Sequence, residues 1–256
     1  MATATTSLPA GAGRQARDTL LVLLGLIVLW QLLHWLAGSV ALASPWASVV
    51  RLGELLGRAS FYPNLAETAL AFGQALVISL LGGLAIGVAL GANRLAGAVA
   101  DPILVALYSI PKVTLYPLIL LFFGLGMEAK VAFGAIHGII PVIIFTMNAV
   151  RHIRPVYLRS ARVMRLGPLE TARTILVPAC IPEIVSGFRI GFALTILGTL
   201  IGELFASQRG LGFLLMKAMH SNDTPTILAI ALLLFAFASL CSWGLLALDR
   251  RLHRRT

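Results

Sequence analysis

The sequence predicts an all-α integral membrane protein with six transmembrane helices. Of its 256 residues, 59% are hydrophobic and only 12% are charged, against roughly 25% charged residues in ordinary globular proteins. A bilayer core about 30 Å thick is crossed by about 20 apolar residues in a helix, so six crossings use near half of the chain. We therefore expect one transmembrane domain over residues 20–248, between a cytoplasmic tail of residues 1–19 and a basic tail of residues 249–256.

The first apolar run covers residues 20–40 and is preceded by Arg14 and Arg17. The residues that follow it, Ala41 to Ala43, resemble a signal-peptidase site, so a cleaved signal peptide is one interpretation. Signal h-regions usually span about 7 to 15 residues, and this run is longer. We therefore favour an uncleaved first helix.

Residues 44–67 are too polar to span and predict an external loop with an interfacial helix. Five further spans follow, at about residues 68–92, 102–123, 129–150, 182–205 and 225–248. Proline interrupts the third of these, at Pro102 and Pro117.

The basic residues orient the six spans, because short cytoplasmic loops are enriched in Lys and Arg. Of the 20 Lys and Arg residues, five lie on the side opposite the termini, and Lys112 and Arg189 lie inside spans. The other thirteen lie on the side of the termini: Arg14, Arg17, Arg94, Arg151, Arg154, Arg159, Arg162, Arg165, Arg173, Arg250, Arg251, Arg254 and Arg255. This places both termini in the cytoplasm and explains the net charge of +10 without nucleic-acid binding.

Glycine stripes indicate how the helices pack, since small residues let transmembrane helices approach closely. The fifth span carries Gly187, Gly191, Gly198 and Gly202 within an arc of about 60° at 100° per residue, and the second carries Gly83, Gly87 and Gly91 at steps of four. Glycine is common in membrane helices, so a single pair would mean little. Four on one arc predict that the fifth helix lies deep in a bundle or at a subunit interface.

Charged residues inside the spans are candidates for a solute pathway or gate. Glu203 lies near the outer end of the fifth span, where it could also simply reach water. Lys112 follows Pro111 in the interrupted third span, and broken helices often line transport pathways. A lysine stem can also extend its charge to the interface.

The chain lacks every motif that would let it act alone as an enzyme or an ion-coupled carrier. It has no GxxxxGK[ST], HExxH or GxSxG motif, no metal-ligand spacing around Cys180 and Cys241, and no cluster of intramembrane carboxylates. We expect no cofactor and no metal. Energy for uphill transport must therefore come from another polypeptide.

The longest cytoplasmic loop, residues 151–177, is where that partner is expected to bind. Residues 155–169 predict a short helix opened by Pro155 and ended at Gly167 and Pro168. We expect Ser160 and Ala161 to be small because a partner approaches them, and Gly167 to need a positive φ. The alternative is a basic loop that only fixes the topology.

Several stretches of the chain resemble the permease subunits of binding-protein-dependent ABC importers, and most closely their nitrate, sulfonate and taurine branch. These stretches are residues 160–167 with 175–184 and 187–191, which resemble the EAA loop, and residues 109–112, 117–118, 123–126, 202–203 and 210–212. There are two departures. Ala161 stands where the family usually has glutamate, and the spacing from Gly167 to Pro178 is about two residues short.

The resemblance implies a type I importer permease fold, similar to that of the methionine importer, in the bacterial inner membrane. It further implies three partners, besides membrane lipid: an ABC ATPase, an external solute-binding protein and a second permease copy that forms a homodimer with this one. The implied solute is a small anion such as a sulfonate, taurine or nitrate. The implied ATPase-coupling residues are Leu158, Arg159, Ser160, Ala161, Arg162, Met164, Arg165, Leu166 and Gly167. A self-sufficient secondary carrier is the alternative function.

Overall fold

The computed structural model describes residues 11–253, and every regular element in them is helical. The long helices are α1 (Gly11–Ala37), α3 (Tyr62–Ala92), α6 (Met127–Arg151), α9 (Val177–Ala206) and α11 (Thr224–His253). Shorter ones are α2 (Pro45–Leu56), α4 (Arg94–Ser109), α5 (Tyr116–Phe123), α7 (Pro155–Val163), α8 (Pro168–Thr171) and α10 (Leu211–His220). The all-α fold class is confirmed.

Within residues 11–253, five helices are long and apolar enough to cross a membrane, and a bent pair of helices brings the number to six if the pair is counted as one span. That pair is α4 with α5, which meet at 88° across the short helix η2 (Lys112–Leu115). Pro111 marks the break, because it has no N–H to continue α4 and disfavours helical backbone at Ile110, which is extended. Pro102, which the sequence suggested as an interruption, lies inside α4, and Pro117 lies in the first turn of α5.

Contacts divide the chain into two compact units. One contains residues 1–57 and 218–233, and the other contains residues 58–217 and 234–256. In the first unit, the indole of Trp30 in α1 donates to the Ala43 carbonyl at 3.0 Å, just before α2 begins. Ser44 caps α2 by accepting from the Ala47 N–H at 3.1 Å.

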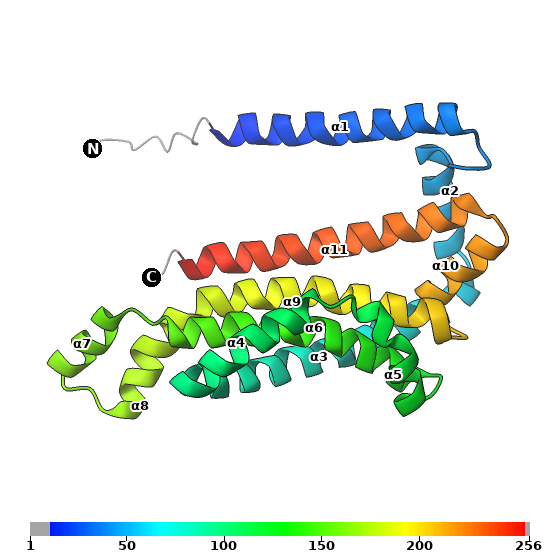
Figure 1. The fold of residues 1–256 in the computed structure, drawn as a ribbon. Helices are drawn as coiled ribbons and strands as arrows, with labels where there is room; N and C mark the ends of the chain where they lie inside the picture. The colour runs from blue at the N-terminus through cyan, green and yellow to red at the C-terminus, as the bar shows by residue number, and fades with distance from the viewer. Residues whose placement is uncertain (1–10, 254–256) are drawn as a thin grey trace, which may run out of the picture. The chain divides into compact units, whose positions relative to one another are not determined.

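The second unit is built around α6, which packs against α3 on one side and α9 on another (Figure 1). Gly134 and Gly138 of α6 face Thr199 and Thr195 of α9. No larger residue fits there, because a Cβ at Gly138 would lie 2.9 Å from the Gly191 carbonyl oxygen. Helices therefore touch almost backbone to backbone in the core of this unit.

Candidate functional site

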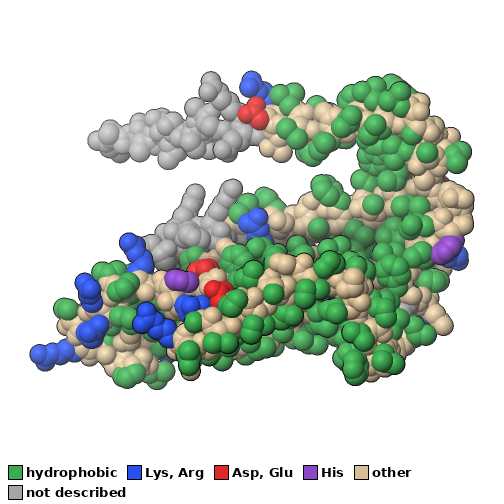
Figure 2. Space-filling model, in the orientation of Figure 1, with side chains coloured by type: hydrophobic (Ala, Val, Ile, Leu, Met, Phe, Trp, Pro, Cys, Tyr) green, Lys and Arg blue, Asp and Glu red, His purple; other side chains and the backbone are tan. Residues whose placement is uncertain are grey.

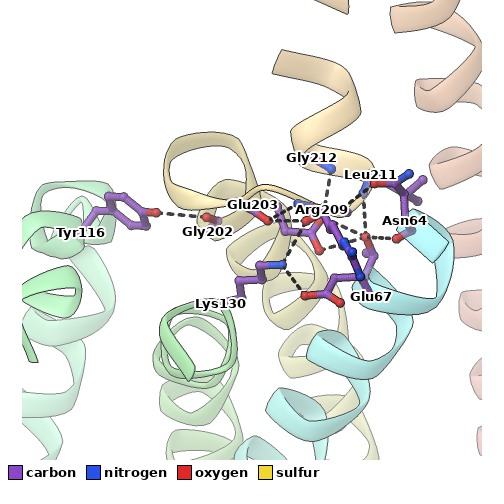
Figure 3. Close-up of polar contacts among 12 residues, drawn as sticks. Asn64, Glu67, Tyr116, Lys130, Gly202, Glu203, Arg209, Leu211 and Gly212 are labelled. Carbon is purple, nitrogen blue, oxygen red and sulfur yellow. Dashed lines mark hydrogen bonds and ion pairs between the residues drawn. The ribbon is translucent and has the colours of Figure 1, made fainter. Parts of the chain in front are cut away.

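A buried carboxylate lies in the second unit, near the end of α9 that leads into α10. Glu203 of α9 is fully buried, and both of its carboxylate oxygens lie within 2.9 Å of the Thr68 hydroxyl on α3 (Figure 3). The Gly212 N–H, at the start of α10, donates to Oε2 at 2.9 Å. The sequence allowed Glu203 to be a gate residue or a charge that reaches water at a helix end. Because its side chain is fully buried, it does not reach water.

The turn between α9 and α10 wraps around this carboxylate and explains two of its glycines. Gly210 has φ +122°, and a Cβ there would collide with the Glu203 carboxylate. A Cβ at Gly212 would lie 2.6 Å from the Glu203 Cβ. The Gly210 N–H donates to the Asn64 side chain at 3.1 Å, so the turn is also fixed to α3.

A buried ion pair completes the network. Lys130 of α6 is 2% exposed, and its Nζ lies 2.9 Å from Glu67 Oε1 on α3 and 3.0 Å from the Arg209 carbonyl oxygen. The sequence counted Lys130 among the five basic residues on the side opposite the termini, at the first residues of the fourth span; α6 begins at Met127 and buries it. Its signal was a lone lysine at the edge of an apolar run, with Glu67 at the matching edge of another.

The network therefore holds α3, α6, α9 and the turn between α9 and α10 together, and its buried polar groups have hydrogen-bond partners (Figure 3). We call this network the polar lock. A cleft of about 520 Å³ lies beside it, and Glu67, Lys130 and Arg209 line this cleft whereas Glu203 does not. Glu203, one of the two gate candidates, therefore joins α9 to α3 and to the start of α10. Among residues 11–253, no group of three His, Cys, Asp or Glu residues could hold a metal ion.

The other gate candidate, Lys112, lies at the break between α4 and α5. It is 8% exposed, its Nζ donates to the Tyr108 carbonyl at 3.1 Å, and the ammonium lies 5.2 Å from the centre of the Tyr108 ring. The lysine thus supplies a donor to a carbonyl at the end of α4, where helical partners are missing.

Both glycine stripes face α6. A Cβ at Gly83, Gly87 or Gly91 of α3 would lie within 2.7 Å of side-chain atoms of Val142, Thr146 or Val150. On α9, Gly187, Gly191 and Gly198 lie against Phe145, Val142 and His137, and Gly202 lies against Lys130. The partner of the α9 stripe is thus a helix of the same chain.

The loop of residues 151–177 differs from its expected structure. The helix α7 ends at Val163, six residues earlier than expected, and Pro168 opens the next helix instead of ending this one. The N–H of Leu166 bonds to the Ala161 carbonyl and that of Arg165 to the Arg162 carbonyl, both at 3.1 Å, the pattern of a Schellman motif.

The expected positive φ at Gly167 is wrong. Gly167 has φ −67° and open space around it, whereas Arg165 has φ +53° in the left-handed position of the Schellman motif. The sequence misled because glycine usually occupies that position. Ala161 is buried, at 4% exposed, within this chain alone, and α7 packs on the π-helical turn η3 (Ala172–Leu176).

The rest of the loop presents arginine and apolar side chains to its surroundings. Val163 is 83% exposed and Met164 is 56% exposed. Arg159, Arg162 and Arg165 are also exposed. Lys and Arg side chains gather at the α7 end of the second unit (Figure 2). Of the expected coupling residues, the exposed ones are Leu158, Arg159, Ser160, Arg162, Met164, Arg165 and Gly167; Leu166 is half-buried.

A further polar cluster, in the first unit, was not found from the sequence. Arg51 of α2 donates to Asp223 at 3.1 Å and to the Thr226 hydroxyl at 2.8 Å, and Asp223 caps α11 through the Thr226 N–H at 3.1 Å. Burial acts to raise the pKa of Asp223, but the bonds from Thr226 and the charge of Arg51 outweigh it and hold that pKa below its ordinary value. The hydrogen bond to Glu54 is the main cause that raises the pKa of Arg51, against burial.

Known proteins resemble this chain along most of its length. Residues 79–255 match the family described as "Binding-protein-dependent transport system inner membrane component". The taurine transport system permease protein TauC of Escherichia coli (strain K12) is 28% identical over 76% of this chain and 70% of its own. The putative aliphatic sulfonates transport permease protein SsuC of Bacillus subtilis (strain 168) is 26% identical over 89% of this chain and 83% of its own.

A solved structure shares the fold. One chain of the MetNI methionine ABC transporter, in an inward-facing crystal form, matches with a TM-score of 0.58 and 20% identity over 77% of this chain and 96% of its own. The expected methionine-importer-like fold is confirmed. The chain therefore belongs to the inner membrane components of binding-protein-dependent transport systems: it is a permease subunit of an ABC importer, not an enzyme.

Proposed function

We propose that this permease imports a small anion, such as a sulfonate, taurine or nitrate, and that α7 couples it to a separate ATPase. The chemistry of the solute is supported by relatives named for taurine, aliphatic sulfonates and nitrate. Relatives named for riboflavin and formylaminopyrimidine also match, so the solute must be tested directly. Two copies of this chain, two ATPase subunits and an external binding protein form the working importer.

The observation that carries the coupling proposal is the surface of α7. The loop from Arg154 to Gly167 is closed at one end by Pro155 in the first turn and at the other by the Schellman motif, so its shape is fixed by its own backbone. Its exposed arginine and apolar side chains have the composition of a protein interface, in which arginine and methionine are enriched. The thirteen basic residues on the side of the termini support a cytoplasmic position for this loop.

The test reconstitutes the permease with the ATPase and the binding protein encoded beside it and measures ATP-driven uptake of taurine, nitrate, ethanesulfonate and riboflavin. We expect uptake of an anion, and only with the ATPase present. Uptake without any ATPase would instead support a secondary carrier. Uptake of riboflavin alone would contradict the proposal that the solute is a small anion.

The coupling variant is Met164→Glu, matched by Leu95→Glu. Leu95 is 75% exposed at the start of α4, on the same side of the predicted topology but outside the loop. A charge at Met164 should weaken ATPase recovery or leave hydrolysis unlinked to uptake, whereas Leu95→Glu should keep both. Equal behaviour of the two variants would remove α7 from the coupling. Gly167→Val should introduce no backbone strain, because φ −67° suits any residue.

A further inference from the structure

A groove of about 570 Å³ lies in the second unit, within the span formed by α9. It is walled by apolar side chains of α9, including Ile190, Phe192 and Ile196, and by Ala238 of α11. Four polar side chains enter it: Arg189 and Ser186 from α9, Tyr108 from α4 and Ser242 from α11. Mostly apolar walls with a few convergent polar groups are typical of small-molecule sites, and the volume lies in their usual range of about 300–1,000 Å³.

Arg189 is the charge of this groove, and it lies well inside a span. In the expected span of residues 182–205 it lies seven residues from one end and sixteen from the other, about 11 Å and 24 Å at 1.5 Å per residue. Arginine at such depth is costly and is normally paired or functional.

Unlike the other basic residues within the spans, Arg189 has no partner among the residues that the structure describes. Lys130 is paired with Glu67, and Lys112 donates to the Tyr108 carbonyl. The ion pairs and hydrogen bonds described for residues 11–253 do not include the Arg189 side chain, which is exposed. No Asp or Glu lines the groove, so the charge of Arg189 is not neutralised there.

The surroundings of Arg189 favour an anion. Lys112 places a second positive charge 5.2 Å from the ring of Tyr108, which itself lines the groove. The Ser186 hydroxyl is occupied by the Pro182 carbonyl at 3.0 Å, whereas Tyr108 and Ser242 offer hydroxyl donors. A guanidinium binds sulfonate, nitrate or carboxylate oxygens with two parallel hydrogen bonds, which are strong between apolar walls.

We propose that this groove binds the anionic group of the solute inside the membrane, with Arg189 as the residue that contacts it. The inference rests on the proposed import of a small anion and names the position in the permease where that anion is held. A lipid phosphate has similar chemistry, and the test separates the two sources.

The test labels the groove with charged thiol reagents. Ser242→Cys is introduced after Cys180 and Cys241 are replaced by alanine, and the permease is assembled with its ATPase and binding protein in phosphatidylcholine vesicles. A methanethiosulfonate that carries a sulfonate should react about ten-fold faster than one that carries a trimethylammonium group, the ratio expected for a charge-assisted hydrogen bond. Ethanesulfonate and nitrate should slow the reaction.

Arg189→Gln should abolish this preference, and Arg173→Gln, which removes an exposed arginine in η3, should preserve it. No preference, or a preference that survives Arg189→Gln, would overturn the proposal. If vesicles that contain phosphatidylglycerol abolish both the preference and the protection by ethanesulfonate, the groove holds a lipid headgroup and the assignment to the solute fails.

Uptake measurements separate this inference from the proposed function. We expect Arg189→Gln to lower anion uptake about ten-fold or more, with ATP hydrolysis still stimulated by the binding protein. Unchanged uptake in Arg189→Gln would overturn the role of the groove and leave the anion importer intact. Wild-type protein that imports only riboflavin would contradict the anion importer itself, whatever the labelling shows.

Discussion

Lys130, whose side chain is 2% exposed, is held by one carboxylate and one carbonyl. Replacing Lys130 with methionine keeps most of the side-chain volume but leaves Glu67 and the Arg209 carbonyl without their donor. Breaking a buried pair typically costs about 3–5 kcal/mol, and we expect the lower end because Glu67 is 26% exposed. Thermal unfolding of the purified protein in detergent measures the loss.

The control for Lys130→Met is Arg159→Met, which removes a charge from the exposed surface of α7. It should change stability by less than about 0.5 kcal/mol. Adding Glu67→Gln to Lys130→Met should restore part of the stability, since no unpaired charge then remains near the core. If the double variant is as unstable as the sum of the two single ones, the pair is not coupled.

At the scale of helices, the two glycines Gly73 and Gly87 of α3 make a matched pair. A Cβ at Gly87 would lie 2.6 Å from the Thr146 Cβ and 2.9 Å from the Ile143 carbonyl oxygen, whereas Gly73 has nothing within 4 Å. We expect Gly87→Leu to cost about 1–3 kcal/mol through overpacking, and Gly73→Leu to be tolerated. Assembly yield and thermal stability are the measurements, and equal effects at both positions would show that α3 does not pack on α6 through this stripe.

The cluster of Arg51, Asp223 and Thr226 ties α2 to the start of α11 and makes stability depend on pH. Because the pKa of Asp223 is lower folded than unfolded, its contribution is fully present above the unfolded value of about 3.9 and is lost as the pH falls through the folded value. We expect Asp223→Asn to lose up to about 1 kcal/mol near neutral pH. In stability measurements from pH 7 downward, the difference between the two proteins should shrink once the pH falls below about 3.9; a constant difference would mean that the charge is not responsible.

For the whole chain, the arginine distribution predicts the topology, which labelling can test. With Cys180 and Cys241 replaced by alanine, a cysteine at Arg162 in α7 should react with an impermeant thiol reagent only from the cytoplasm. A cysteine at Arg58, between α2 and η1 (Ala59–Phe61), should react only from outside. Labelling of the Arg162 position in intact cells would contradict six spans with both termini inside.

The sequence was sufficient for the spans because length and hydropathy alone determine them, and the expected ranges agree closely with α3, α6, α9 and α11. It was not sufficient for the polar lock. Thr68, Glu67 and Lys130 are brought to Glu203 and Arg209 only by the packing of three helices, which no local pattern encodes. The prediction for the loop was wrong for a related reason. Residue propensity assigned the left-handed backbone conformation to Gly167, whereas the Schellman motif places it at Arg165.

The position of α6 has a mechanical consequence. Its first turn is fixed through Lys130, its middle touches α9 through glycines, and its last residue, Arg151, continues into the loop that returns through η3 to α9. Both ends of the loop therefore lead into helices with little freedom to slide. We expect a displacement of α7 to tilt α6 and α9 together as one rigid body. We expect the 88° break between α4 and α5 to act as the hinge.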